Sequence, residues 1–204
     1  HADLLQASSW ADSDETQKAQ WTTFDLTAKL ENGNGTYSPN RMMILMQGAG
    51  ECLVDDVEMI KIGSTNLLTN GNFENTNNAS KWEITGTHEQ SFVENTAGVD
   101  GSRCLHIRAQ GDGDTGVNSI RRTLQNGLAA GNSGRIKAKV RWLAGWPEIL
   151  FRVQGSWIEL AGRMDVPTNL GTPGKANSRR VANGGPRSEE HTSELQSQVR
   201  ISYA

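Results

Sequence analysis

Histidines are the first candidates for chemistry in this chain, and they occupy four positions: His1, His88, His106 and His191. Catalytic and metal-binding residues need partners at characteristic spacing, yet the sequence has no Gly-x-Ser-x-Gly elbow, no Gly-rich phosphate loop and no His-Glu-x-x-His. His106 alternates with apolar neighbours, as a strand residue does. Only His88, in the loop sequence Gly-Thr-His-Glu, is a candidate for ligand contact, and a solvated loop histidine is the alternative.

Paired carboxylates could hydrolyse a glycoside, but only if the two groups lie about 5 to 10 Å apart in a cleft. Asp55 and Asp56 are adjacent in sequence, and adjacent residues of a strand point to opposite faces of a sheet. We therefore expect no enzyme activity. The acidic loop from Gly111 to Gly116 is typical of a tight turn whose short side chains bind their own backbone, with a surface calcium site as the alternative.

Tryptophan offers a different chemistry, because its flat face can stack on a sugar ring while polar neighbours bind the hydroxyls. Trp142 falls on the apolar side of a predicted strand and is expected in the core. Trp146 lies in the turn Ala-Gly-Trp-Pro, and Trp157 follows the turn Gly-Ser. The residues that we expect to contact a glycan are Trp146, Trp157, His88 and Trp82.

The elements that must position these side chains are predicted to be β-strands. Basic and apolar residues alternate strictly through Arg135, Ile136, Lys137, Ala138, Lys139, Val140, Arg141 and Trp142. This pattern is typical of a half-buried antiparallel strand. Its basic side is interpreted as a solvated sheet face, with an acidic polysaccharide or another domain as the alternative partner. Similar short runs recur between turns rich in Gly and Asn, which predicts an all-β fold, an antiparallel β-sandwich of the jelly-roll type.

Composition narrows the class of protein further. The chain has 204 residues, of which 35% are hydrophobic and 22 are glycine, with a net charge of -3. No apolar run approaches the about 18 residues of a membrane-spanning helix, and a near-neutral charge argues against nucleic-acid binding. Cys52 and Cys104 give neither a disulfide framework nor zinc spacing, and we interpret both as small buried thiols.

Two motifs suggest a family. The segment Asn66-Leu-Leu-Thr-Asn-Gly-Asn-Phe-Glu74, followed by Trp82, resembles the opening strand of bacterial carbohydrate-binding modules of the galactose-binding-like jelly-roll type. The segment Cys52-Leu-Val-Asp-Asp-Val57 looks like their closing strand. This resemblance implies a structural calcium ion that joins first and last strands, with Glu74 and Asp55 as candidate ligands. No other cofactor is expected.

The order of the two motifs predicts a tandem of modules. Residues 1–63 would be the C-terminal part of a truncated jelly-roll module, and residues 64–166 a nearly complete galactose-binding-like module. A weak echo between Ile44-Leu-Met-Gln-Gly and Phe151-Arg-Val-Gln-Gly supports two copies of one unit. The second copy departs from the family because it offers only Met164-Asp-Val in place of the closing motif.

The ends of the chain have a different character. Residues 167–186 are rich in Gly, Pro and Asn, which predicts a linker. Residues 187–197 and 201–204 resemble the in-frame translation of a short-read sequencing adapter interrupted by its index, so we interpret residues 187–204 as an artefactual, disordered tail. His1 is not an initiator methionine, and we expect an internal fragment of a longer chain.

These observations together predict a non-catalytic, carbohydrate-binding-like module. The segments 140–150 and 169–178 look like junctions in large bacterial surface proteins with lamin-tail and spore-coat-kinase-like domains, which implies an extracellular, multidomain setting. A glycan and neighbouring domains of the same full-length chain are the expected partners. The alternative is a structural spacer or domain-interaction module without glycan affinity, in which every tryptophan packs in the core or against another domain.

Overall fold

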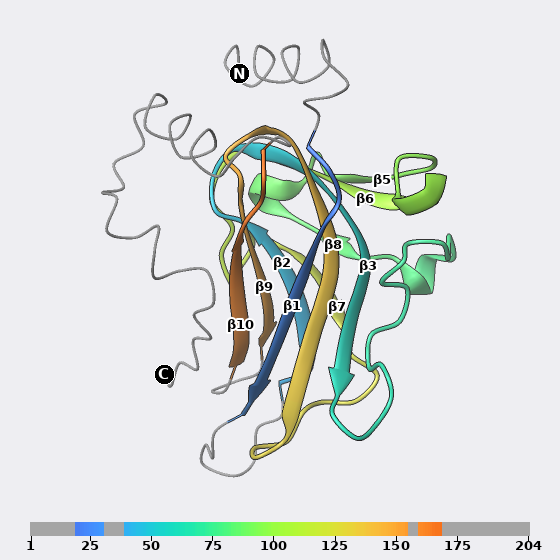
Figure 1. Cartoon of the computed structure of the whole chain (residues 1–204), viewed down its shortest axis with the longest axis vertical. Helices are drawn as coiled ribbons and strands as arrows, with labels where there is room; N and C mark the ends of the chain where they lie inside the picture. Colours follow the sequence, from blue (N-terminus) through green and yellow to red (C-terminus); the bar gives the residue numbers. More distant parts are fainter. Residues whose placement is uncertain (1–18, 31–38, 155–158, 169–204) are drawn as a thin grey trace, which may run out of the picture.

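A computed structural model describes residues 19–30, 39–154 and 159–168, and it confirms the predicted antiparallel β-sandwich (Figure 1). Sheet A has the order β1 (Thr22–Lys29), β8 (Ser133–Gly145), β3 (Gly50–Lys61), β6 (Cys104–Ala109) and β5 (Phe92–Glu94). Sheet B has the order β10 (Glu159–Asp165), β9 (Glu148–Gln154), β2 (Arg41–Met46), β7 (Ile120–Thr123) and β4 (Glu83–Ile84). Every pairing is antiparallel.

The helical elements of the described residues are three short 3₁₀ turns. They are η2 (Asn78–Ser80), η3 (Gly86–His88) and η4 (Val99–Gly101). None of the described helices is long and apolar enough to cross a membrane.

The core lies between the two sheets and follows the period-two pattern of the sequence. The apolar side of β8 is buried and its basic side faces outward, as predicted. Phe24 of sheet A meets Phe151 of sheet B with their ring centroids 4.7 Å apart. Cys52 and Cys104 are buried and free, which confirms the interpretation as buried thiols. Burial raises the pKa of the Cys104 thiol to about 12, so the thiol stays protonated.

The predicted division into two modules at residue 63 is wrong for the described residues. Strand β3 lies in the middle of sheet A between β8 and β6, and β2 lies in the middle of sheet B between β9 and β7. A boundary after residue 63 would cut through both sheets. The described parts of residues 1–63 and 64–166 therefore form one sandwich.

The closing and opening motifs pair with each other inside this one sandwich. The amide of Leu67 donates to the carbonyl of Met59 over 2.7 Å, and the amide of Val57 donates to the carbonyl of Gly71 over 2.9 Å. The Asn66 side chain accepts from the amides of Met59 and Leu68, each at 3.0 Å. The closing strand absent from the end of residues 64–166 is thus supplied by residues 50–61.

The sequence echo also has a different cause. The residues Ile44 and Phe151 stand opposite each other, because β2 and β9 are antiparallel neighbours in sheet B. The echo therefore marks two adjacent strands of one sheet, not two copies of a module.

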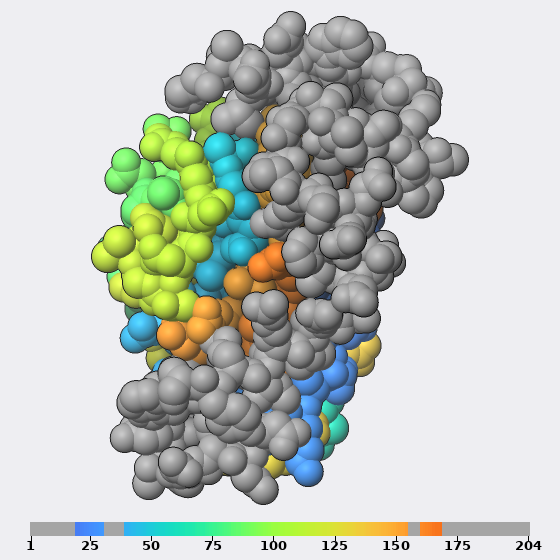
Figure 2. All heavy atoms as spheres, turned by 90° about the vertical axis from the view of Figure 1, so that its left-hand side faces the viewer, coloured from blue at the N-terminus to red at the C-terminus, as the bar shows by residue number. Residues whose placement is uncertain are grey.

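The outer side of sheet B is partly covered by a loop. Figure 2 shows the lime atoms of the chain around residue 110 beside the cyan atoms of β2. The amide of Gly113 donates to the Met46 carbonyl over 2.8 Å, and a Cβ on Gly113 would lie 2.9 Å from the Leu45 Cβ. Ile44 and Met46 point into the core, so Leu45 between them points to the outer side of sheet B. Leu45 is nevertheless buried, because the loop covers it.

Candidate functional site

Trp82 is a structural residue, which contradicts its predicted contact with a glycan. Only 7% of the residue is exposed. Its indole nitrogen donates to the carbonyl of Asn70 over 3.0 Å, and its ring lies against Phe73 with centroids 5.6 Å apart. The opening motif and this tryptophan therefore close one end of the core and present no flat face to a sugar.

His88 is fully buried. The prediction that it contacts a ligand and the alternative of a solvated loop histidine are therefore both wrong. Its Nε2 accepts from the Met46 amide over 2.9 Å, which leaves the ring proton on Nδ1, 3.0 Å from Thr87 Oγ1. The Thr87 hydroxyl donates in turn to the Asp112 carbonyl over 3.1 Å. Turn η3 thus inserts a neutral imidazole between β2 and the loop that covers sheet B. Burial lowers the pKa of His88 from 6.5 to about 4.

This buried histidine should make the protein sensitive to acid. Between pH 6.5 and about 4 the unfolded chain takes up a proton at His88 that the folded protein excludes. The free energy of unfolding should therefore fall by about 3 kcal/mol across that window. Equilibrium denaturation at several pH values measures it. The variant His88→Gln, which cannot titrate, should have a flatter pH dependence, and identical slopes for both proteins would contradict this assignment.

The loop from Gly111 to Gly116 binds its own backbone, as predicted. Asp114 Oδ1 accepts from the Gly116 amide over 2.7 Å and from the Asn118 amide over 3.2 Å. A hydrogen bond from the Asn118 side chain, together with these two backbone bonds, holds the pKa of the Asp114 carboxyl below its ordinary value. The Asp114 side chain therefore stabilises this turn.

Trp146 is half-buried in the turn between β8 and β9. Its amide donates to the Ala49 carbonyl over 2.8 Å, and its indole nitrogen is 3.3 Å from Glu148 Oε2. A Cβ on Gly48 would lie 2.6 Å from Trp146 Cγ, so the backbone of the β2–β3 turn packs directly on the ring. Trp146 joins two turns, and its role as a sugar platform stays a prediction. Trp157 lies outside the described residues, while Trp142 is in the core as expected.

Asp55 and Glu74 hold the same turn from two sides. Asp55 Oδ2 accepts from the Val99 amide over 2.9 Å and from Ser102 Oγ over 3.1 Å, and its Oδ1 accepts from the Asp56 amide. Glu74 Oε1 accepts from the Arg103 amide over 2.8 Å. Burial raises the pKa of the Asp55 carboxyl despite these donors.

These contacts do not fit the calcium ion that the family resemblance implies. A calcium ion needs six to eight oxygen ligands, whereas both oxygens of Asp55 already accept hydrogen bonds. The described part of the chain has no group of three or more His, Cys, Asp or Glu residues that could hold a metal. Asp55 and Glu74 instead fix the turn at Val99 to Arg103 through hydrogen bonds to its backbone.

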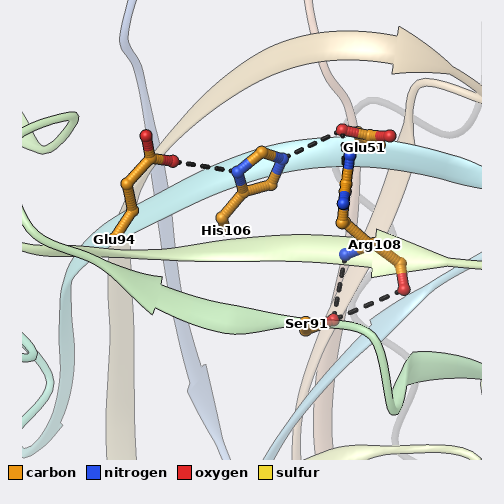
Figure 3. Close-up of polar contacts among 5 residues, drawn as sticks. All are labelled: Glu51, Ser91, Glu94, His106 and Arg108. Carbon is orange, nitrogen blue, oxygen red and sulfur yellow. Dashed lines mark hydrogen bonds and ion pairs between the residues drawn. The ribbon is translucent and has the colours of Figure 1, made fainter. Parts of the chain in front are cut away.

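A cluster that sequence reasoning missed lies on the outer face of sheet A (Figure 3). His106 Nδ1 is 2.9 Å from Glu94 Oε2, and His106 Nε2 is 3.0 Å from Glu51 Oε2. Carboxylates only accept hydrogen bonds, so both contacts are hydrogen bonds only when the imidazole is protonated on both nitrogens. His106 of β6 thereby links β5 to β3.

Arg108 and Ser91 complete the polar part of this cluster. Arg108 Nε lies 3.4 Å from Glu51 Oε2, and the Arg108 amide donates to Ser91 Oγ over 2.9 Å. The bond from His106, with the charge of Arg108, holds the pKa of the Glu51 carboxyl below its ordinary value. Glu51 therefore stays ionised beside His106 and Arg108.

Phe92 adds an apolar surface to the same place. It is 42% exposed, and its ring centroid lies 4.9 Å from that of His106 with a tilt of 38°. A protonated imidazole against an aromatic ring is a favourable cation–π contact. We call Phe92, Glu94, His106, Arg108 and Glu51 the Phe92 patch.

A signal for the patch was present in the sequence. His106 and Arg108 alternate with Leu105 and Ile107, which marks a polar outer face of β6. The sequence cannot show that this face meets Glu94 and Glu51, which are 12 and 55 residues from His106 along the chain.

Comparisons of the chain with protein-family models, with curated proteins and with solved structures found no match. The described residues form a β-sandwich with an aromatic and charged patch on one sheet face.

Proposed function

We propose that this chain is a non-catalytic glycan-binding module of an exported multidomain protein, and that it contacts the glycan through the Phe92 patch. One observation carries the proposal. An exposed aromatic ring lies beside His106, whose nitrogens are within 3.0 Å of two carboxylates, and a guanidinium group lies 3.4 Å from one of these carboxylates. Sugar-binding sites combine these two features, since the ring stacks on C–H groups and the polar groups bind hydroxyls.

A second candidate function is supported by the tryptophans. Trp82 and Trp142 are buried, and Trp146 is packed against the backbone of Gly48. Such a distribution suits a structural spacer that positions neighbouring domains and has no glycan affinity. The glycan-binding function requires that Phe92 contributes to glycan affinity, whereas a spacer binds no glycan.

The variant Phe92→Ala should lower glycan affinity about tenfold, because the stacking surface is lost. Binding of the full chain to an array of neutral and acidic glycans, followed by titration of the best ligand, measures this change. Val117→Ala is the matched control, since Val117 is a 71% exposed apolar residue in the loop that covers sheet B. Absence of any glycan binding, or equal losses in both variants, would favour the spacer.

A further inference from the structure

The Phe92 patch holds two carboxylates and one guanidinium group, which restricts the ligands that it can bind. Glu51 and Glu94 are negative and Arg108 is positive, while His106 carries a charge only when it is protonated. An anionic ligand therefore gains no favourable long-range field from the patch.

The polar atoms that remain available on the patch include two carboxylate oxygens, which are acceptors. Glu51 and Glu94 each use Oε2 to bind His106, and the Oε1 atom of each has no partner among the described residues. Both side chains are partly exposed. A sugar hydroxyl can donate to such an oxygen, whereas the carboxylate of an acidic sugar has no proton to donate and would be repelled.

The arrangement of these acceptors is fixed before a ligand arrives. Figure 3 shows Glu94 and Glu51 on opposite sides of the His106 ring. They come from β5 and β3, the two strands that flank β6. Phe92 stands opposite His106 in the register of β5 and β6, so its ring lies beside the line that joins the two carboxylates. Groups held in this way lose little conformational entropy on binding.

The basic side of β8, on the same face of sheet A, does not favour an acidic ligand either. Arg135 Nε donates to Asp25 Oδ1 over 2.7 Å. The ammonium groups of Lys139 and Lys137 lie 3.4 Å and 3.8 Å from carboxylates of Asp56 and Glu58. Each of these three positive charges thus has a carboxylate neighbour, and the fourth basic residue, Arg141, donates from Nε to the Ala19 carbonyl over 2.8 Å. The basis for an acidic polysaccharide partner is therefore weaker than the sequence pattern indicates.

We infer that the ligand of the Phe92 patch is an uncharged sugar, which stacks on Phe92 and donates hydroxyl hydrogen bonds to the free carboxylate oxygens of Glu51 and Glu94. This inference rests on the proposed function and names the class of glycan.

Isothermal titration of the full chain with neutral hexasaccharides of glucose, mannose, galactose and xylose, and with oligogalacturonate, tests the inference. At least one neutral sugar should bind with an affinity that changes little with salt, because no net charge is neutralised. Oligogalacturonate should bind at least tenfold more weakly. Binding only of oligogalacturonate would overturn the inference and leave the glycan-binding proposal intact, whereas binding of no sugar in this set or on the array would overturn both.

The variant Glu94→Gln tests the role of the carboxylates, because it keeps the shape of the side chain and removes the charge. Affinity for the neutral sugar should fall about tenfold while affinity for oligogalacturonate rises. Glu58→Gln is the matched control on the same sheet face and should change neither. Thermal unfolding verifies that each variant is folded, and Glu51→Gln replaces Glu94→Gln if the latter is not. An unchanged neutral-sugar affinity in the folded carboxylate variant would overturn the inference.

Discussion

Removal of residues 1–63 is expected to leave a chain that does not fold. The truncation deletes β1, β2 and β3, and with them the central strand of each sheet. Eight large apolar residues of these strands are at most 1% exposed: Met42, Met43, Ile44, Leu45, Met46, Val54, Val57 and Met59. Burial of each of these side chains contributes about 2 kcal/mol to stability. Their sum is at least comparable to the free energy of unfolding of a typical domain, which is about 5 to 15 kcal/mol.

Circular dichroism and a proton–nitrogen correlation spectrum of residues 64–204 measure this effect. We expect a spectrum without dispersion and no cooperative thermal transition. Deletion of residues 187–204 is the control, and it should leave the midpoint of unfolding unchanged because this segment resembles a translated adapter. A cooperative transition in the chain that lacks residues 1–63 would show that residues 64–166 are an independent module after all.

Replacement of Gly71 by alanine is expected to destabilise the protein by about 3 kcal/mol, which lowers the midpoint of thermal unfolding by about 10 °C. A Cβ at this position would lie 1.8 Å from the carbonyl oxygen of Val57. The backbone of residue 71 would have to move away from β3. That movement would break the hydrogen bond from the Val57 amide to the Gly71 carbonyl.

Chemical denaturation at equilibrium measures this loss, and Gly111→Ala is the matched control. At Gly111 the nearest atom to a new Cβ is Thr87 Cγ2 at 3.7 Å, an ordinary contact. We expect a change below about 0.5 kcal/mol there. Equal stability of the two variants would contradict the close approach of the opening motif to β3. This approach also gives a physical reason for the glycine in the motif Asn-Gly-Asn-Phe-Glu.

Local patterns were sufficient to predict the strands but not their neighbours. The alternation through residues 133–142 gives the direction of every side chain of β8 from sequence alone. The pairing of β8 with β1 and β3 joins residues about 110 and 80 positions away in sequence, and no local pattern encodes such a pairing. Without knowledge of such pairings, the order of the two family-like motifs predicts separate modules. In the structure the two motifs pair with each other within one sandwich.

The histidines show the same limit at the level of single residues. His88 stands in a polar loop sequence, yet η3 turns its ring inward to accept the Met46 amide. The alternation of His106 with apolar neighbours predicts that its ring faces outward, but not that the ring lies between two carboxylates. In both cases at least one partner that the ring needs lies 12 or more positions away along the chain.

We propose that the outer face of sheet A, at the Phe92 patch, binds a neutral glycan. The most direct test is a proton–nitrogen correlation spectrum of the full chain during titration with the neutral hexasaccharide that binds best. We expect the largest shifts on the amides of residues 91–94, 106, 108 and 51. Shifts confined to the Trp146 turn or to residues 110–118, or no shifts at saturating sugar, would contradict glycan binding at the Phe92 patch.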